Sequence, residues 1–452
     1  MSNRIRYALV GTGVRAFLYR DALSGPHAAH GELVALCDIN PRRAANWQAF
    51  SGRHATGPAL PEPLPVYPPA DFTRMLKDER VDRVIVTSID RTHHHYICAA
   101  MEAGCDVISE KPMTTDAGKC ARILRTLERT GRQLRVTFNL RYAPRHVKVK
   151  QVLASGAIGD ILSVHFEWLL DTRHGADYFR RWHRDKRNSG GLLVHKSTHH
   201  FDLANWWLDS VPESVFAQGG LRFYGRANAE ARGLTRFHDR DRDLPDPSAD
   251  PFAIDLNAEP VHKALYIDAE PDNAYVRDRN VFSDGISIED DLGLLITYRN
   301  RIVMTYHLTA YSPWEGFRIA FNGTRGRLEY ESTTRPWLSP GGLDDNLVRN
   351  LGVGSATTDT QYAEPVSLVL RPHWAPPERI PMSGLNGGGH GGGDPRMVRD
   401  LFDPSARESD PLGQAAGVRE GLYSVLCGVA GNQSLATGQP VRLADLVPGL
   451  PG

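Results

Sequence analysis

The hydrophobic pattern of the first 140 residues is a series of short apolar runs separated by longer, more polar stretches. The runs, which are rich in strand-forming residues, are 5–10, 33–37, 84–86, 107–108 and 136–138. An apolar-periodic helix lies before the fourth run and stops at Gly104. Strands that alternate with helices are typical of a parallel sheet. We therefore predict an α/β domain over residues 1–140.

The second part of the chain has a different pattern, in which apolar and polar residues alternate. Residues 162–170 place apolar side chains at every second position, which indicates a strand with one packed face. Two pairs of similar runs predict hairpins, 292–298 with 302–308 and 317–321 with 327–330. We therefore predict a domain over residues 141–452 with a large, mostly antiparallel sheet. A helix at about 414–437 is expected to pack back on this domain or on the interdomain seam.

Two segments lack these regular patterns. Residues 227–260 are charged and contain proline, and residues 335–360 are rich in Gly, Pro, Thr and Asn, so both are predicted to be long loops. The antiparallel sheet is expected to leave one face bare. An apolar bare face would join subunits of a homo-oligomer, a dimer or tetramer, whereas a solvated face is the alternative.

The composition is that of an ordinary globular chain with room for two domains. The 452 residues are 41% hydrophobic and 23% charged, and 53 basic residues balance 53 acidic ones. No basic stripe is interleaved with aromatic residues, which argues against a nucleic-acid partner. No apolar run approaches the roughly 20 residues of a membrane span. Five cysteines without a C-x-x-C pair, and no recognisable signal peptide, predict a cytoplasmic location.

The first predicted strand ends in a glycine loop, Gly11-Thr12-Gly13-Val14-Arg15-Ala16. In a dinucleotide-binding loop the first glycine permits a tight turn, and the second lets the backbone approach a pyrophosphate. A small residue at the position of Ala16 lets the helix pack closely on the strand. The start of that helix would offer N–H groups and a positive dipole end to the phosphates. The motif alone is equally compatible with an ordinary loop, but its place between strand and helix favours a dinucleotide.

The second predicted strand ends in Asp38, where a carboxylate can accept hydrogen bonds from the adenosine ribose hydroxyls. This favours NAD over NADP as the cofactor. A helix N-cap or turn aspartate is the alternative, since Asn40-Pro41 follows. Arg42 or Arg43 could instead hold a 2′-phosphate, and we include Arg43 among the residues expected to contact the cofactor.

The fourth predicted strand delivers Glu110-Lys111-Pro112 at its carboxyl end, where parallel sheets bind their ligands. An ammonium group beside a nicotinamide can hydrogen-bond the reacting hydroxyl, and its pKa can fall if the site is desolvated. We therefore predict that Lys111 is catalytic. A lysine that only pairs with Glu110 or the cofactor is the alternative.

Together these motifs resemble the Gfo/Idh/MocA family of glucose-fructose oxidoreductases, inositol dehydrogenases and rhizopine-catabolism proteins. The residues that carry the resemblance are Gly11 to Ala16, Asp38, Ser88-Ile89-Asp90, His93, Ala103-Gly104, Glu110-Lys111-Pro112, Asn139-Leu140-Arg141-Tyr142, Gly190-Gly191, His195, His199 and Asp202. The resemblance implies an N-terminal Rossmann domain and a C-terminal domain with an open sheet. It implies hydride transfer to or from a carbinol of a sugar or cyclitol. It also implies that Ser88, Asp90, His93, Glu110, Lys111 and Asn139 join the glycine loop in contacting the cofactor.

The chain departs from the family pattern at two places. It has Ser88-Ile89-Asp90 where the family usually has Thr-Pro-Asn, and His195 where an aspartate usually stands four residues before the histidine. The second departure concerns the catalytic centre. The resulting fold class is α/β, with a Rossmann domain over 1–140 and an α+β domain for substrate binding and oligomerisation over 141–452.

A predicted helix after Gly190-Gly191 carries His195, His199, Asp202 and Trp206 at the spacing of a single helical face. Because histidine titrates near neutral pH, His195 or His199 could take the hydroxyl proton as hydride leaves, with Asp202 orienting His199. Histidines with a purely structural role are the alternative. Zinc is disfavoured because the run His195 to His199 lacks the glutamate of H-E-x-x-H, so we predict no metal.

Two segments contain residues suited to carbohydrate binding. Residues 177–186 combine aromatic rings, which stack on sugar C–H faces, with arginines, which donate paired hydrogen bonds; a solvated basic loop is the alternative. His390 stands between two glycine triplets, a pattern that indicates a loop in close approach to a ligand. The residues expected to contact the substrate are Lys111, Arg141, Tyr142, Tyr178, Trp182, His183, His195, Lys196, His199 and His390.

The sequence therefore predicts an NAD(H)-dependent oxidoreductase that acts on a secondary hydroxyl or ketone of a sugar, glycoside or cyclitol. One alternative is a glycoside hydrolase that keeps its NAD and acts by transient oxidation, elimination, water addition and re-reduction. The other is a non-catalytic protein that senses nucleotides.

Overall fold

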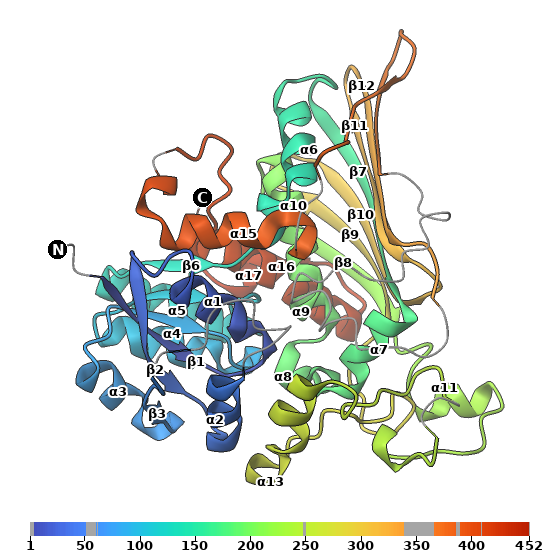
Figure 1. Cartoon of the computed structure of the whole chain (residues 1–452). Coiled ribbons are helices and arrows are strands. Elements are labelled where there is room, and N and C mark those ends of the chain that lie inside the picture. Colours follow the sequence, from blue (N-terminus) through green and yellow to red (C-terminus); the bar gives the residue numbers. More distant parts are fainter. Residues whose placement is uncertain are drawn as a thin grey trace.

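A computed structural model describes residues 4–50, 60, 62–246, 250–338, 366–385, 389–407 and 409–451 of the chain. Two domains lie side by side, the N-terminal one on the left of Figure 1 and the large sheet of the second on the right. A parallel sheet is followed by a mostly antiparallel sheet, as predicted. No helix within the described ranges is long and apolar enough to cross a membrane.

The N-terminal domain is built on a parallel sheet whose six described strands pair in the order β3-β2-β1-β4-β5-β6. The strands are β1 Ile5–Val10, β2 Gly31–Cys37, β3 Val66–Tyr67, β4 Arg83–Val86, β5 Asp106–Ser109 and β6 Leu134–Val136. The helices are α1 Phe17–Ser24, α2 Pro41–Ala49, α3 Phe72–Asp78, α4 His93–Glu102 and α5 Ala117–Thr130. The order of connection reverses between β1 and β4, so a ligand crevice is expected at the carboxyl ends of these two strands.

The second domain is built on a sheet of nine described strands in the order β14-β13-β12-β11-β7-β10-β9-β8-β15. The strands are β7 Ile161–Asp171, β8 Pro212–Gly220, β9 Asp291–Tyr298, β10 Val303–Ser312, β11 Glu315–Gly323, β12 Gly326–Arg335, β13 Ser367–Pro372, β14 Glu378–Arg379 and β15 Val441–Arg442. β10 and β7 pair in parallel, and the other described neighbours are antiparallel. Both predicted hairpins are confirmed, as β9–β10 and β11–β12.

Helices cover one face of this sheet (Figure 1). They are α6 Pro144–Ala154, α9 Leu192–His195, α10 Ser197–Leu208 and α16 Val418–Thr437. A Cβ on Gly428 would lie 2.3 Å from the carbonyl oxygen of Leu193, so glycine lets α16 lie directly against α9. Near the start of α16, Ala416 accepts a hydrogen bond from Val136 N in β6. The C-terminal helix therefore packs on the second domain and also reaches the interdomain seam.

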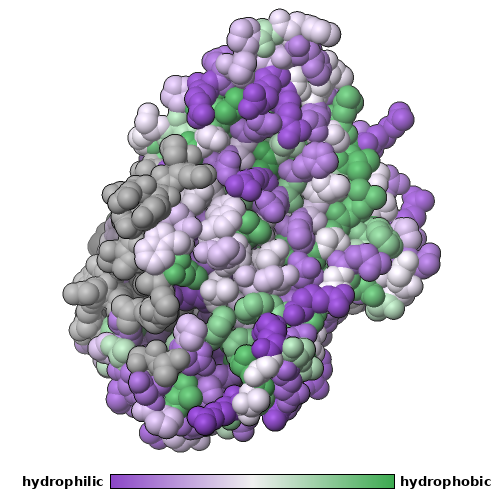
Figure 2. All heavy atoms as spheres, turned by 90° about the vertical axis from the view of Figure 1, so that its right-hand side faces the viewer, coloured by the Kyte–Doolittle hydropathy of each residue, from purple (hydrophilic) through white to green (hydrophobic). Residues whose placement is uncertain are grey.

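The opposite face of the sheet carries mainly polar side chains. Ion pairs join Arg318 to Glu331 and Arg371 to Glu329, and His307 contacts Asp291 across neighbouring strands. Figure 2 shows hydrophilic residues over much of this side of the molecule, with hydrophobic residues gathered in smaller groups. The bare face is thus more polar than a core-like interface would require, and the homo-oligomer remains a prediction.

The segment between β8 and β9 contains more structure than the sequence predicts. Its helices and helical turns are α11 Arg226–Ala231, the 3-10 turn η6 Asp241–Asp243, α12 Pro260–His262, the π-helical turn η8 Lys263–Ile267 and α13 Glu270–Asn273. The predicted loop over 227–260 is therefore correct for most of its described length but wrong at its start, where α11 forms. The predicted loop over 335–360 overlaps the end of β12, and residues 339–360 lie outside the described residues.

Candidate active site

The glycine loop lies where β1 and β4 face each other. Gly11 has φ +91°, and a Cβ there would come within 2.8 Å of the backbone of Thr87 and Ser88, so only glycine fits. A Cβ on Gly13 would meet a single atom of the described residues within 4 Å, the Tyr266 hydroxyl at 3.9 Å. The loop is therefore anchored at Gly11 and leaves open space at Gly13, as a loop that receives a ligand must.

Asp38 closes the other side of this crevice. One carboxylate oxygen accepts hydrogen bonds from Thr12 N at 2.7 Å and Thr12 Oγ1 at 2.8 Å, and the other accepts from Asn40 N at 2.8 Å. Arg43 Nη1 lies 3.8 Å from the same carboxylate. Asp38 thus holds the glycine loop and the start of α2 in a fixed relation.

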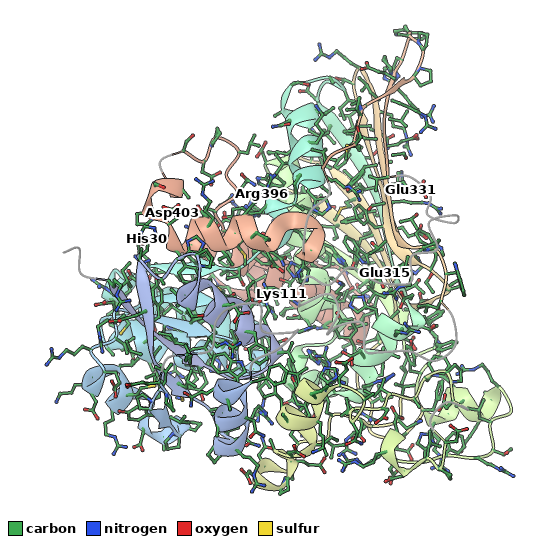
Figure 3. All side chains as sticks on the ribbon, in the orientation of Figure 1. His30, Lys111, Glu315, Glu331, Arg396 and Asp403 are labelled. Carbon is green, nitrogen blue, oxygen red and sulfur yellow. The ribbon has the colours of Figure 1, made fainter. Side chains whose placement is uncertain are left out.

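A cavity of about 580 Å³ lies between the two domains. Figure 3 shows Lys111 at this junction, where the nucleotide-domain sheet faces the second domain. The sequence-predicted residues that line the cavity are Arg15, Ser88, Asp90, His93, Glu110, Lys111, Asn139, Tyr178, Trp182, His183, His195, Lys196, His199 and His390. The fold therefore brings most of the candidate site residues together from both domains.

Lys111 follows β5, and its peptide bond to Pro112 is cis. The Lys111 ammonium donates a hydrogen bond to the backbone carbonyl of His195 at 3.2 Å. Glu110 is engaged elsewhere, since one of its oxygens accepts from Arg15 Nε at 2.5 Å and from Tyr19 Oη at 2.7 Å. Burial lowers the pKa of Lys111, while the charges of Asp90 and Glu110 oppose that shift. Lys111 is therefore a cation whose proton is held less tightly than usual.

His195 forms a close pair with Asp90. His195 Nδ1 lies 2.5 Å from Asp90 Oδ2. Burial lowers the pKa of His195 well below its ordinary value, and the positive charges of Lys111 and Arg181 lower it further. The His195 imidazole is therefore neutral. Burial also raises the pKa of Asp90 well above its ordinary value, which the charges of Lys111 and Arg181 oppose, so one proton is held between His195 Nδ1 and Asp90 Oδ2. In the tautomer in which Nδ1 carries that proton, Nε2 is left as a proton acceptor.

The His195 ring is surrounded by three aromatic side chains of the cavity wall. Its centroid lies 4.1 Å from that of His183, 5.5 Å from Tyr178 and 5.7 Å from Trp182. His183 in turn stacks on Trp182 at 3.5 Å. These rings restrict the orientation of the imidazole.

Several buried polar atoms of residues that line the cavity have no hydrogen-bond partner among the described residues. Two of them are His199 Nδ1 and Asn139 Oδ1. Burial lowers the pKa of His199 well below its ordinary value, and Lys111 and Lys196 add to the shift. Because buried polar groups are normally satisfied, these two atoms indicate that a polar ligand belongs here.

Asp394, which the sequence analysis did not select as a site residue, connects Arg15 of the glycine loop with Asn139 and His390. Its carboxylate accepts from Arg15 Nη2 at 3.1 Å and from Asn139 Nδ2 at 2.8 Å, and it contacts His390 Nδ1 at 2.6 Å. Burial alone would raise the pKa of Asp394, but Arg15 and His390 hold it well below its ordinary value. The predicted close-approach loop around His390 is thus tied to the glycine loop, although Gly387 and Gly388 lie outside the described residues.

Three expectations for this region need correction. Asp202 does not orient His199; it forms a bidentate ion pair with Arg141, with both nitrogen–oxygen distances 2.7 Å. Arg141 is therefore committed to a buried structural contact, and Tyr142 donates its hydroxyl proton to Asp400 at 2.8 Å, so neither lies at the cavity wall. The single predicted helix is also divided at Lys196 into α9 and α10, which separates His195 from the helix that carries His199 and Asp202.

The far end of the cavity is lined by residues that the sequence analysis missed as site residues. They are Arg145, His146, Trp168, Phe317, Tyr330, Thr333 and Thr334, among others. They come from α6 and from strands of the second sheet, so only the fold brings them together. His174 contacts Glu315 at 2.8 Å and the Tyr178 hydroxyl at 3.1 Å, which holds Tyr178 in the wall. Among the described residues, no three or more His, Cys, Asp or Glu side chains are grouped to hold a metal ion.

Comparison with protein-family models identifies two matching regions. Residues 5–138 match the model described as oxidoreductase family, NAD-binding Rossmann fold. Residues 150–443 match the model described as oxidoreductase family, C-terminal alpha/beta domain. The two matches meet near residue 140, close to the predicted domain boundary.

Comparison with individual proteins also finds similarity to oxidoreductases. The chain is 32% identical to YteT of Bacillus subtilis (strain 168), which is named as an oxidoreductase, over 96% of this chain and 97% of YteT. It is 27% identical to the inositol 2-dehydrogenase of Rubrobacter xylanophilus over 48% of this chain and 56% of that enzyme. The structure of the WlbA dehydrogenase from Bordetella pertussis, in complex with NADH and UDP-GlcNAcA, is similar with a TM-score of 0.61 at 17% identity, covering 97% of this chain and 99% of WlbA.

Proposed function

Because this chain belongs to the Gfo/Idh/MocA oxidoreductase family, we propose that it transfers a hydride between a nicotinamide cofactor and a secondary hydroxyl, or the matching ketone, of a sugar, glycoside or cyclitol. One observation carries this proposal: Lys111, Asp90 and His195 meet at the carboxyl edge of the nucleotide-domain sheet. Together they supply a cation, a carboxylate and a neutral imidazole, which are the groups that proton transfer at a hydroxyl requires.

The crevice fits a dinucleotide cofactor. Gly13 has open space at its Cβ position, and Asp38 stands beside the glycine loop at the end of β2. The unpartnered Asn139 Oδ1 and His199 Nδ1 are suited to a polar ligand at the cavity end. When bound, the nicotinamide supplies the hydride acceptor for oxidation or the hydride donor for reduction.

The chain's own residues handle the proton. During oxidation of a hydroxyl, the C–H bond breaks with its electron pair and the O–H proton passes to a base. His195 Nε2 is that base in our proposal, because Asp90 fixes the opposite nitrogen and stabilises the imidazolium that forms. Lys111 holds the reacting oxygen, and His199 offers a second neutral imidazole in the cavity wall. Reduction reverses these proton movements.

The cavity wall supports a carbohydrate substrate. Tyr178 and Trp182 provide aromatic surface, while Lys196, Thr333 and Thr334 provide hydrogen-bonding groups. A volume of about 580 Å³ is sufficient for a sugar ring beside a nicotinamide. Dehydrogenation of inositol by a relative and the UDP-GlcNAcA bound by WlbA are in line with a hydroxyl-rich substrate.

A specific observation keeps the glycoside hydrolase as a second candidate. Five buried imidazoles whose pKa values are lowered by burial line the cavity, those of His93, His146, His183, His195 and His199. Dehydrogenation alone requires one proton acceptor, whereas elimination and water addition require further proton transfers at neighbouring carbons. Additional neutral imidazoles would serve those steps.

We expect net hydride transfer when the purified protein is incubated with NAD and a panel of sugars, cyclitols and glycosides. NADH formed, measured at 340 nm, should match the amount of ketone product found by mass spectrometry. A hydrolase would instead release the aglycone with catalytic NAD, accumulate no NADH and take up solvent deuterium at the carbon beside the transiently oxidised one. A protein that binds nucleotide and converts no substrate in the panel would favour the sensor alternative.

NAD is expected to bind at least about 10-fold more tightly than NADP, the size of effect that one hydrogen bond to a charged group produces. Asp38 would repel a 2′-phosphate. Arg43, which could attract one, is engaged: its Nε donates to the Leu265 carbonyl at 3.1 Å, and its guanidinium lies over the rings of Tyr266 and Tyr275. Fluorescence titration with NADH and NADPH measures the two affinities. Asp38→Ala should reduce the ratio between them. Equal affinities in the unmodified protein would contradict the assignment.

A further inference from the structure

Residues 260–277 of the second domain lie across the nucleotide domain. We call this segment, which contains α12, η8 and α13, the strap. In Figure 1, α13 lies beside α2 at the bottom of the molecule, although the two are separated by more than 200 residues of chain. The strap therefore joins two parts of the protein whose relation the sequence does not indicate.

Polar contacts connect the strap to the first turns of α2. Asn40 Nδ2 donates to the Ala269 carbonyl at 2.7 Å, while Asn40 Oδ1 caps α2 by accepting from Arg43 N at 2.8 Å. Asn46 Nδ2 donates to the Ala264 carbonyl at 2.6 Å. The same turn of chain thus begins α2 and binds the strap, so movement of the strap would disturb the helix beside Asp38.

Apolar contacts anchor the strap more deeply. Val261 and Leu265 are completely buried and belong to the same hydrophobic cluster as Phe17 of α1 and Trp47 of α2. A mobile surface loop would not bury such side chains. The strap is therefore a packed part of the nucleotide domain, contributed by the second domain.

The strap also reaches the place where the cofactor is expected. The Tyr266 hydroxyl is the described atom that faces Gly13, the loop position that approaches a pyrophosphate. Arg43 lies between Asp38 and the rings of Tyr266 and Tyr275. The strap thus stands over the glycine loop and beside the carboxylate that would bind the adenosine ribose.

A chain of ion pairs continues from the strap to the candidate active site. Arg277 is buried at the end of the strap and pairs with Asp177 at 2.8 Å. The other oxygen of Asp177 pairs at 2.7 Å with Arg181, which lines the cavity near His195. These ion pairs therefore link the strap to the wall of the cavity on the side where the substrate is expected.

We propose that the strap closes over the adenosine half of the bound dinucleotide and retains it between turnovers. This inference rests on the proposed function, since it takes the glycine loop and Asp38 as the cofactor site. Release of the cofactor would require Val261 and Leu265 to leave their cluster and the Asn40 and Asn46 hydrogen bonds to break. A retained cofactor suits a reaction in which the hydride is returned within the same site, so the strap bears on the choice between the two candidate functions.

The test is the rate at which NADH leaves the full-length protein. The loaded protein is mixed with excess NAD, and loss of bound-NADH fluorescence is followed in a stopped-flow instrument. We expect Tyr266→Ala and Leu265→Ala each to release NADH at least about 10-fold faster than the unmodified protein. Lys263→Ala is the matched control, because Lys263 is exposed on the same segment and pairs with Asp268 within it. The control should release NADH at the unmodified rate.

Each other outcome is informative. An unchanged rate of NADH release in both strap variants would overturn the proposed role of the strap but not the proposed function, because NADH would then be held without the strap's help. Tighter NADH binding with faster association in the variants also overturns it, since the strap would then obstruct the site. Failure of the unmodified protein to bind NADH overturns the strap together with the proposed cofactor.

A second measurement avoids dependence on the variants' stability. In the unmodified protein, NADH should slow amide hydrogen exchange in residues 260–277 and in the first turns of α2. Exchange in α11, which lies in the same long connection but away from α2, should not change. Absence of protection in the strap on NADH binding would contradict the proposal.

Discussion

Replacing Lys111 with alanine is expected to reduce turnover at least ~10²-fold, the usual size for loss of a positioned acid–base group, while NADH affinity changes by less than about threefold. The Lys111 ammonium donates to the His195 carbonyl and lies with Asp90 in the cavity. Burial lowers the pKa of Lys111, so its proton is available to a reacting oxygen. Alanine removes that donor and also the positive charge that most strongly lowers the pKa of the buried Asp90.

Steady-state kinetics on the true substrate and NADH fluorescence titration separate the two effects. Lys77→Ala, a change of the same type at an exposed position of α3, is the control and should behave as the unmodified protein. Unmodified turnover in Lys111→Ala would eliminate the catalytic role. A large loss of NADH affinity with unmodified turnover at saturating cofactor would show that Lys111 serves cofactor binding alone.

The sequence was sufficient to predict the framework of the nucleotide domain. Runs such as 5–10 and 33–37 are apolar enough to be strands of a parallel sheet, and the glycine loop and Asp38 follow directly from them. Lys111 could be placed because it follows shortly after a strand, and the carboxyl ends of parallel strands share one edge. Local signals of this kind require knowledge of only a few neighbouring residues.

The contacts of the candidate site could not be predicted in the same way. Asp202 has helical spacing from His199 and lies with it on α10, yet its carboxylate pairs with Arg141 instead. The partner of His195 is Asp90, which lies 105 residues away and shows its role only when the two domains are assembled. Asp394 likewise meets Arg15 across most of the chain. Side-chain partners are set by packing between distant elements, which spacing along the chain does not encode.

The strap was missed for a related reason. Residues 260–277 have no apolar periodicity long enough to predict a helix, because the structure forms short helical turns there rather than one regular element. Val261 and Leu265 are buried against another domain, so their apolar character appears isolated in the sequence. A segment that is stabilised by a distant surface leaves little local signal.

Replacing Asp90 with asparagine is expected to lower kcat/KM at least ~10²-fold and to shift its pH dependence. The amide retains the shape of the side chain but loses the charge that stabilises His195 once it has taken a proton. The pKa of His195, already lowered by burial, should fall further, so the acid limb of the profile moves to lower pH. Asp90 also opposes the lowering of the Lys111 pKa, so the alkaline limb should move in the same direction.

These shifts distinguish a catalytic pair from a structural one. A merely structural Asp90 would lower the unfolding temperature on substitution but leave both limbs of the profile of kcat/KM against pH in place. Asp78→Asn, the same exchange at an exposed position of α3, controls for the change of net charge and should leave the profile unaltered. His195→Ala should remove the acid limb altogether, because the group that must be neutral is gone. An Asp90→Asn profile that coincides with that of the unmodified protein would mean that the 2.5 Å contact between Asp90 and His195 has no part in proton transfer.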